Sequence, residues 1–438
     1  MLRLATRTLL CLTLAAAARA GAQQDAGDSP RPISLDEAVR QAQANSPQTV
    51  QARGAARVAN ANFKSAVAAF LPSVTLGEYA GKSAGSVYIQ GVLINSTSDW
   101  NFSKGYNANL TIFDGGSRFL QYREAKASSD AAAQAAVVQA YAIALQVKQQ
   151  YFAVLAAREA EAAAEQQLTE ANAQLEVTEA KLAGGSASRA DSLNSAVTVG
   201  QARLAVLKAQ GALVTANTSL TRLVGGDHEL TAVVADTAGI PAIGVDSASL
   251  LRMALEGPAV QQATRQAAAN RSAWWMSLTR YLPSIGMGYS WNNNFANPNF
   301  ILGGGSRAAT HSTSLYISYS LFDNFRREAN VVTADANADA ANATLRDARL
   351  AARENLSQYL ATFRTAAQTI DLQRLQIEAA TENVAAKDAQ YRAGAVGLVD
   401  VLTAQTALAQ ARQALIQARL DARTAKAQIE ALIGKNLD

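Results

Sequence analysis

The chain has little of what most enzymes and metalloproteins use. Its 438 residues include one cysteine and two histidines. Cys11 lies in an N-terminal segment typical of an export signal, so the exported chain would have no thiol for a disulfide, a metal or a nucleophile. His228 and His311 are isolated, and two histidines cannot supply the three or four ligands of a zinc site. The sequence therefore predicts no metal and no bound cofactor.

Long hydrophobic runs and aromatic residues are also scarce. Beyond the N-terminal segment, no stretch approaches the roughly 18 consecutive apolar residues of a transmembrane helix, so any membrane crossing must use strands. Aromatic residues make up 6% of the chain although apolar residues make up 49%. Much of the apolar share is alanine, which favours helix but fills little core volume. Long, thin helical packing fits this composition better than one large globule.

The N-terminal segment predicts export from the cytoplasm. Residues 1–22 begin with Arg3 and Arg7, continue with the apolar run LLCLTLAAAA and end in small residues, which is the pattern of a signal peptide cleaved after Ala22. Removing these two arginines and Arg19 lowers the net charge from +4 to +1. The basic balance of the chain therefore gives no support to a nucleic-acid partner.

One short motif resembles a catalytic signature but lacks its context. GKSAG fits G-x-S-x-G around Ser83, yet it lies in an interval expected to form an outer hairpin and has no histidine partner. The same GKS cannot be a phosphate-binding loop, because the required leading glycine is Leu76. We expect no enzymatic activity.

What the chain does contain is a duplication. FLPSVTL and YLPSIGM place Pro72 and Pro283 211 positions apart, and LTIFDGG and YSLFDNF place Asp114 and Asp323 209 positions apart. KLAGGSASRADSL and QYRAGAVGLVDVL, and then LVGGD and LIGKN, keep the second offset. The sequence therefore predicts two structural repeats, 23–236 and 237–438.

Both repeats share one plan. A first helix, opened in the first repeat by the capping box of Ser34 and Glu37, stops before the LPS proline. Some 60 residues after the FD turn lack proline and span about 90 Å as helix. Leu168, Leu175 and Leu182 recur every seven residues, as in a coiled coil. We expect β-hairpins at 73–113 and 284–322 and helical hairpins at 117–224 and 326–434.

The β intervals have the alternation of half-buried strands. In SIGMGYSWN, Ile285, Met287, Tyr289 and Trp291 alternate with serine and glycine, and STSLYISYSLF does the same. Strands of about 10 residues with aromatics near their ends match transmembrane β-strands, although a soluble hairpin would alternate too. Four strands cannot close a barrel, and an open edge cannot face lipid. Three chains would supply 12 strands.

Taken together, these duplicated landmarks, with YFAVLAAREA and YRAGAVGLVDVLTAQTAL, resemble the TolC-like outer-membrane efflux family. The resemblance covers nearly the whole mature chain. It implies a mainly α fold with a small β part: long helical hairpins forming an α-barrel, and four strands contributed to a trimeric 12-stranded transmembrane β-barrel. It also implies a homotrimer in the outer membrane of a Gram-negative bacterium, extending into the periplasm, with a periplasmic adaptor protein and an inner-membrane transporter as partners.

The resemblance further implies a gate at the helix tips. Asp400 matches an aspartate whose ring narrows the passage, and Tyr391 matches a tyrosine of the closed-state contacts. The chain departs from the family where Thr403 replaces a second aspartate and Val396 replaces an arginine. Asp400 has an alternative role as a first-turn aspartate favoured by the helix dipole, which is the role expected of Asp191.

The tips are also where family members meet the adaptor. The residues of this chain at those positions are Leu182, Gly185, Ala187, Arg392, Gly394 and Leu398. Each glycine is equally well explained as a helix terminator.

Three functions remain open from the sequence. The leading one is the exit duct of a tripartite efflux system that passively conducts small molecules such as drugs. The second is the outer-membrane conduit of a type I protein secretion system. The third, from another class, is a soluble periplasmic coiled-coil scaffold.

Overall fold

The computed structural model describes residues 30–82, 84–97, 100–233, 243–295 and 309–437. The predicted signal peptide, residues 1–22, and Ser83 lie outside these ranges. No helix among the described residues is long and apolar enough to span a bilayer. The chain divides into two units. The first contains Met1–Ser46, Ile143–Ala242 and Ala361–Ala427, and the second contains Pro47–Ala142, Ile243–Leu360 and Gln428–Asp438.

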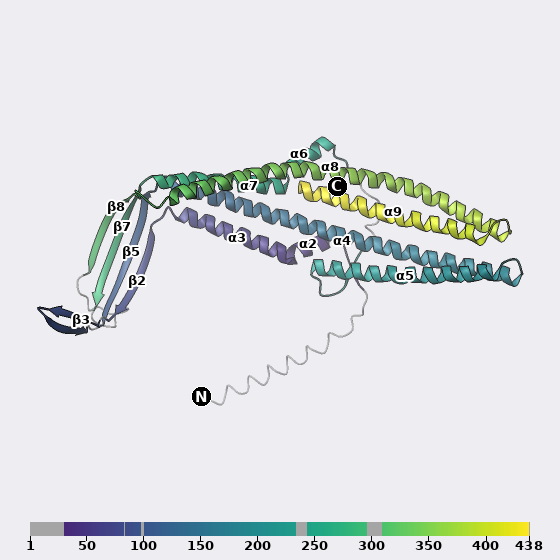
Figure 1. The fold of residues 1–438 in the computed structure, drawn as a ribbon, viewed down its shortest axis with the longest axis horizontal. Coiled ribbons are helices and arrows are strands. Elements are labelled where there is room, and N and C mark those ends of the chain that lie inside the picture. Colours follow the sequence, from purple (N-terminus) through teal and green to yellow (C-terminus); the bar gives the residue numbers. More distant parts are fainter. Residues whose placement is uncertain (1–29, 83, 98–99, 234–242, 296–308, 438) are drawn as a thin grey trace, which may run out of the picture. The chain divides into compact units, whose positions relative to one another are not determined.

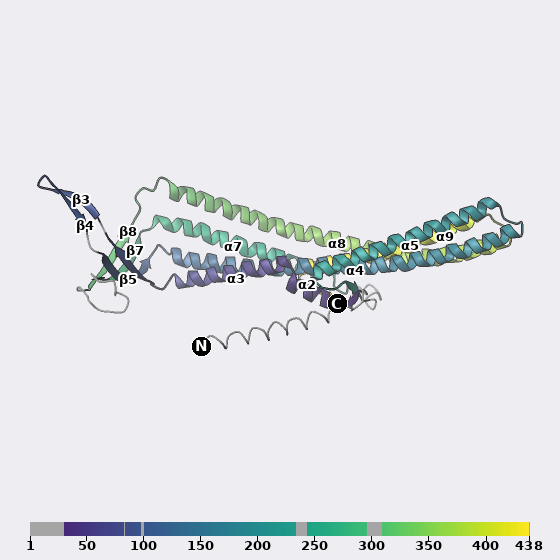
Figure 2. The same cartoon turned by 90° about the horizontal axis from the view of Figure 1, so that it is seen from below.

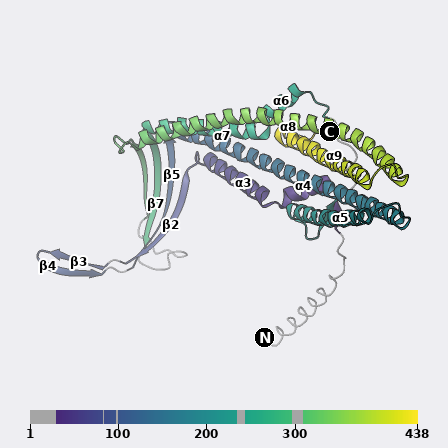
Figure 3. The same cartoon turned by 45° about the vertical axis from the view of Figure 1, so that its right-hand side comes forward.

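The first unit is built from four long helical segments. They belong to α4 (Ser117–Ala183), α5 (Arg189–Val224), α8 (Arg326–Arg392) and α9 (Leu398–Ile433). In this unit α8, α9, α4 and α5 follow one another in that order (Figures 1 and 3). α4 and α8 each have 67 residues, which the proline-free runs predict. They are continuous because nothing in either run removes a backbone donor.

A small β element completes this unit. β1 (Arg31–Ile33) pairs in parallel with β6 (Leu230–Ala232), and α2 (Leu35–Asn45) follows β1. Tyr151, fully buried, donates its hydroxyl to Ile33 O at 3.2 Å and accepts from Val233 N at 3.0 Å. The tyrosine of the YFAVLAAREA motif thus anchors the short sheet to α4.

The capping box predicted at the start of α2 is only half made. Ser34 Oγ accepts from Glu37 N at 3.4 Å, as expected of an N-cap. The Glu37 carboxylate instead accepts from Arg40 and from Gln41, one turn further on. These bonds lower the pKa of Glu37, with the Arg40 bond contributing most. A charged partner within the helix competes successfully with the backbone N–H of the cap.

The second unit carries an antiparallel sheet of four strands. Its order is β2 (Ser73–Gly81), β5 (Asn101–Phe113), β7 (Ser284–Phe295) and β8 (Thr310–Ser318). Met287 lies opposite Leu315 and Ile285 opposite Ile317 on one face, while Ser290 Oγ lies 2.9 Å from Ser312 Oγ on the other. Met287, Leu315 and Ile317 are exposed in the single chain, and Ile285 is half-buried. β2 and β8 are the two edges, and neither pairs with a further strand among the described residues.

The interval between β2 and β5 holds a second hairpin that the sequence reasoning did not separate. β3 (Ala84–Ile89) pairs with β4 (Val92–Thr97) and with neither strand of the larger sheet. Gln90 and Gly91 form its turn, with φ of 49° and 82°. Two adjacent positive φ angles define the type I′ turn that joins tightly paired strands.

The helices of the second unit run along one another next to the sheet (Figures 1 and 2). They are α3 (Pro47–Ala68), α6 (Ser247–Leu255), α7 (Pro258–Leu278) and the first parts of α4 and α8, followed after α7 by the short 3₁₀ helix η2 (Thr279–Tyr281). A core cluster joins Leu250, Leu356, Ile429 and Ile433.

The repeated LPS and FD motifs meet at the junctions between strand and helix. Asp114 accepts from Arg118 N at 3.0 Å and pairs with its guanidinium at 2.9 Å. That guanidinium lies 5.4 Å from the ring centroid of Phe70, the aromatic residue of FLPS. In the second repeat Asp323, Arg327 and Tyr281 make the same arrangement. Each junction is thus held by a capping aspartate and a cation–π contact.

Candidate channel gate at the helix tips

The two long hairpins turn through the same backbone motif. At the end of α4, Gly185 N donates to Leu182 O at 3.0 Å and Ser186 N to Lys181 O at 2.8 Å. At the end of α8, Gly394 N donates to Tyr391 O at 3.0 Å and the next amide to Gln390 O at 2.8 Å. Gly185 and Gly394 have φ of 70° and 78°. These are Schellman turns, in which only glycine adopts the left-handed position without strain.

The two aspartates that follow the turns both cap a helix. Asp191 accepts from Ser188 N at 3.0 Å and from Ser188 Oγ at 2.8 Å, and these bonds, the side-chain one first, lower its pKa. Asp400 Oδ2 accepts from Gly397 N at 3.2 Å. The capping role that the sequence allowed for Asp400 is therefore present. Its side chain is also exposed in the single chain.

Tyr391 is the residue that joins the two hairpins. Its side chain is 5% exposed and packs with Leu398, Val401 and Val177. Its hydroxyl donates to Thr178 Oγ1 of α4 at 3.5 Å. Thr178, fully buried, also receives a hydrogen bond from Ser195 Oγ of α5 at 3.2 Å. Three of the four helices are therefore joined through one buried threonine.

Lys181 closes the same contact from the α4 side. Its ammonium lies 4.4 Å from the centroid of the Tyr391 ring and donates to Tyr391 O. That carbonyl lies in the last turn of α8, where it also accepts from Gly394 N and where the helix dipole favours a cation. One side chain thus binds both the ring and the backbone of Tyr391.

Two ion pairs join α4 to α9 at positions farther from the turns than Tyr391. Arg412 Nη1 lies 3.2 Å from Glu170 Oε1, and Arg419 Nη1 lies 3.1 Å from Glu159 Oε2. All four side chains are roughly one-fifth to one-third exposed. The pairs align the first hairpin with the second, while their partial exposure keeps each one modest in energy.

The remaining predicted site residues lie around the tips with different exposures. Thr403 is exposed, and its hydroxyl donates to Val399 O within its own helix at 2.7 Å. Gly185, Gly394 and Arg392 are exposed, and Arg392 pairs with Asp388 at 3.0 Å. Two predicted contact residues are half-buried, namely Leu182 and Ala187. Leu398 is 3% exposed and packs inside the tip.

Sequence reasoning missed Lys181 and the buried polar residues of the tip. The signal was present in the coiled-coil stripe of α4. Leu168, Ala171 and Leu175 continue to position 178, where the stripe predicts an apolar residue and the chain has Thr178. A polar residue at a core position indicates a buried hydrogen bond, because an unpaired hydroxyl there is costly.

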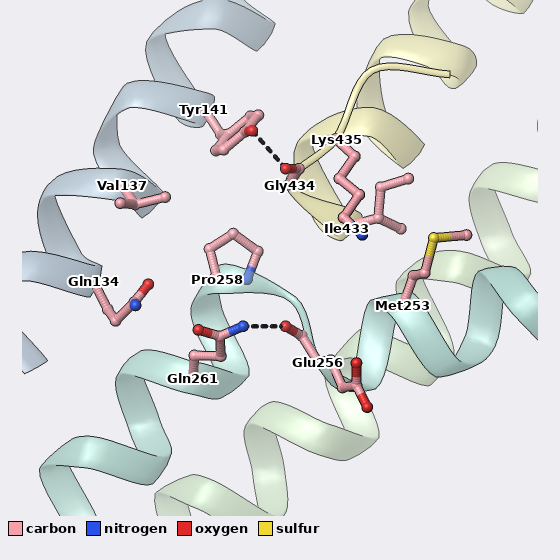
Figure 4. A pocket seen from close by; sticks show the side chains of 10 residues that line it. All are labelled: Gln134, Val137, Tyr141, Met253, Glu256, Pro258, Gln261, Ile433, Gly434 and Lys435. Atoms are coloured by element: carbon pink, nitrogen blue, oxygen red, sulfur yellow. Dashed lines mark hydrogen bonds between the residues drawn. The ribbon is translucent and has the colours of Figure 1, made fainter. Parts of the chain in front are cut away.

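The second unit contains a pocket of about 370 Å³ (Figure 4). Tyr141 OH donates to Gly434 O beside it, and Gln261 Nε2 donates to Glu256 O at 2.7 Å. A side chain at Gly434 would meet Pro258 within 2.6 Å. These contacts serve the junction of α4, α7 and α9. No group of three or more metal-ligating side chains occurs in the part of the chain that the structure describes.

The two hairpins match a known family in both repeats. Residues 38–226 and 250–435 match the family described as outer membrane efflux protein. The chain belongs to this family. It is therefore an efflux channel of the outer membrane that extends into the periplasm, which sets aside the soluble scaffold.

Solved channels have the same fold at low sequence identity. VceC of Vibrio cholerae is 16% identical, with a TM-score of 0.78 over 92% of this chain and 97% of that one. CmeC of Campylobacter jejuni is 16% identical, with a TM-score of 0.79 over 92% and 86%. The open state of MtrE from Neisseria gonorrhoeae is 16% identical, with a TM-score of 0.75 over 95% of each chain.

A curated relative spans most of the chain. Protein CyaE of Bordetella pertussis is 26% identical over 396 residues, which are 87% of this chain and 80% of CyaE. The predicted fold class, mainly α with a small β part and an internal duplication, is confirmed.

Proposed function

We propose that three copies of the chain form a passive exit duct for small molecules such as drugs. The observation that carries the proposal is the open sheet of the second unit, whose edge strands β2 and β8 pair with no further strand among the described residues. In an outer-membrane protein such edges face lipid, where each unpaired backbone group costs several kcal/mol. Three sheets joined edge to edge give 12 strands and leave no edge.

The helices of the first unit continue the duct into the periplasm. In this unit the helical segments form one layer in the order α8, α9, α4 and α5, and such a layer closes into a tube when copies are added at its two outer helices. The duct acts as a passive channel, without catalysis of its own. The energy for transport comes from an inner-membrane transporter, reached through a periplasmic adaptor.

The tips act as the gate of this duct. Three Asp400 carboxylates around the axis form an acidic ring that attracts cations, as charged rings do in channels. Tyr391 and Lys181 hold the closed state, because the tips part only when the ring leaves its pocket. The chain has one acidic ring where Thr403 stands in place of a second aspartate, and it has Val396 packed in the tip cluster rather than an arginine.

The exposed parts of the turns are the surface offered to the adaptor. Gly185, Arg392 and Gly394 are exposed there, Leu182 and Ala187 are half-buried, and Leu398 supports the surface from within. Bulky substitution at Ala187 should leave trimers intact and abolish adaptor cross-linking.

Electrophoresis and fractionation together test the proposal. The purified protein in detergent should migrate as a trimer without heating and as a monomer after boiling. The protein in cells should remain in the outer membrane after washing with carbonate. A protein that purifies as a water-soluble monomer without detergent would contradict the duct.

A further inference from the structure

The junction between sheet and helices is built once in each repeat, and the two versions differ in side chains that the shared contacts do not use. Both versions keep a capping aspartate, its arginine and an aromatic ring, which in the second repeat are Asp323, Arg327 and Tyr281. The offsets of 211 and 209 positions set every other residue of one junction against its counterpart in the other. A residue type found in one version alone is therefore not required to build the turn.

The second junction has two arginines where the first has small residues. Arg280 occupies the position of Ala69, and Arg326 occupies the position of Ser117. Both arginines are exposed. The Arg280 guanidinium has no hydrogen-bond or ionic partner among the described residues, and the Arg326 side chain donates there only from Nε, to Asp323 O at 3.4 Å. These two cations are thus open to a ligand from outside the chain.

Contacts between η2 and α8 bring the two arginines to one place. Tyr281 donates its hydroxyl to Glu328 Oε1 at 3.2 Å, and the Arg327 guanidinium lies 5.1 Å from the centroid of the same ring. Arg280 directly precedes Tyr281, and Arg326 directly precedes Arg327. Neither of the two pairs with Glu328 in the part of the chain that the structure describes.

The turn of the second junction also carries a phenylalanine in a strained conformation. Asn324 and Phe325 have φ of 57° and 60°, where Gly115 and Gly116 of the first repeat have 69° and 85°. Glycine adopts this left-handed region freely, whereas a bulky side chain there is strained. The Phe325 ring is 69% exposed, and its one ring contact is with the equally exposed Phe322, at a centroid distance of 5.7 Å. Retained strain of this kind points to a role beyond packing within the chain.

The position of the junction in the duct indicates what it meets. β7 and β8 join α7 and α8 here (Figure 1). In the proposed duct the sheet crosses the outer membrane and the helices extend into the periplasm, so the junction lies at the headgroups of the periplasmic leaflet. Aromatic side chains favour this level in membrane barrels. Guanidinium groups at this level meet phosphate, which their forked donors match.

We propose that the second junction binds phospholipids of the periplasmic leaflet through their headgroup phosphates. Arg280 and Arg326 donate to the phosphate oxygens. Phe322 and Phe325 lie among the neighbouring acyl chains. Anionic phospholipids bind best, because a zwitterionic headgroup brings its own cation toward the arginines. The inference rests on the proposed membrane duct and adds the lipid that the duct holds at its periplasmic rim.

Lipid binding to the purified trimer tests the two arginines. The double variant Arg280→Ala with Arg326→Ser gives the second junction the residues of the first. Native mass spectrometry of the detergent-solubilised trimer should show phosphatidylglycerol bound about 25-fold more weakly, because each arginine at a membrane surface contributes about a fivefold factor. The control Arg346→Ala with Arg349→Ser removes the same charge from two exposed arginines of α8 that lack ion pairs among the described residues, and it should bind the lipid as the unmodified protein does.

Three outcomes would overturn the lipid site and leave the duct in place. Equal affinity in the double variant and the control would remove the arginines from the site. Displacement of phosphatidylglycerol by inorganic phosphate, but not by chloride at equal ionic strength, would make it a site for free anions. Loss of the trimer from the double variant in lipid-free detergent would place the arginines between copies of the chain. Absence of any trimer from the unmodified protein would overturn the proposed function itself.

A fluorescent label tests the depth of the phenylalanine. Because the sole natural cysteine is Cys11, Phe325→Cys introduces the only thiol beyond the predicted signal peptide. A bimane attached to it should be quenched in vesicles whose phospholipids carry brominated acyl chains. The same label at Val332→Cys, also exposed and about 10 Å further along α8, should remain bright. Equal quenching at the two positions, or none at either, would contradict the placement of Phe325 among acyl chains.

Discussion

Replacement of Lys181 by methionine tests whether the contact between α4 and Tyr391 holds the tips closed. Methionine keeps the unbranched chain that packs against the ring, but it removes the ammonium. The variant therefore loses the hydrogen bond to Tyr391 O and the cation above the ring. The hairpins themselves should fold as before, since their turns depend on Gly185 and Gly394.

The size of the effect follows from the two contacts. A hydrogen bond from a charged donor contributes about 1.5–3 kcal/mol. A cation above an aromatic ring contributes about 0.5 kcal/mol when exposed and about 2 kcal/mol when desolvated. One ammonium makes both contacts, and in the open state it regains water, so we expect a net loss of about 2 kcal/mol per copy. That shifts the equilibrium of each tip about 30-fold toward the parted form.

Single-channel recording in planar bilayers measures the result. Lys181→Met should raise the open fraction, and hydrogen exchange should become faster at the amides near Tyr391. Lys387→Met is the matched control, because Lys387 lies on α8 one turn before Tyr391 and takes no part in the contact. If Lys181→Met and Lys387→Met leave the open fraction and the exchange alike, the tip is not held by this contact.

Three further predictions concern the same tips. Asp400→Asn should weaken the block of single-channel current by divalent cations, and unchanged block would remove Asp400 from the gate. Thr178→Val should lower the local opening free energy measured by hydrogen exchange by about 1–3 kcal/mol, because Ser195 Oγ is left buried without its acceptor. Thr178→Val combined with Ser195→Ala should recover most of that loss. A double variant as unstable as the sum of both single changes would contradict the pairing. Because its hydrogen bonds to Ser188 hold the pKa of Asp191 below its usual 3.8, the start of α5 should be stable above that value and fray as the pH falls through the lowered pKa. Amide hydrogen exchange at the start of α5, corrected for its intrinsic pH dependence, should then increase in the native chain, while Asp191→Ala should show the faster exchange at every pH tested.

The long helices and the duplication could be predicted because they rest on local rules. Proline stops α3 and α7 before the sheet, and its absence lets α4 and α8 run for 67 residues. Gly185 and Gly394 mark the turns because their backbone requires positive φ. Such features need no knowledge of what packs against them.

The contacts of the tip could not be predicted in the same way. Thr178, Lys181 and Tyr391 are distant in the chain, and only the packing of α4 against α8 brings them together. The burial of Leu398 has the same cause, since a helix start looks exposed until a neighbouring helix covers it. The β3–β4 hairpin was missed for another reason: its Gln-Gly turn lacks the asparagine or aspartate that usually marks a type I′ turn.

In each unit, each of the two sequence repeats contributes one outer element, which is a strand in the sheet and a helix in the helical layer. In the sheet, β2 of the first repeat and β8 of the second are the edge strands and have no further partner in the described part of the chain. β5 and β7 join the repeats through partners such as Tyr106 and Trp291, whose ring centroids lie 5.4 Å apart. In the helical layer, α5 and α8 are the two outer helices, while α4 and α9 join the repeats through ion pairs. The outer strands and outer helices of such a chain can therefore be covered only when the second repeat of one copy meets the first repeat of the next. This condition arises separately in the strands and in the helices, and a ring of copies satisfies both at once.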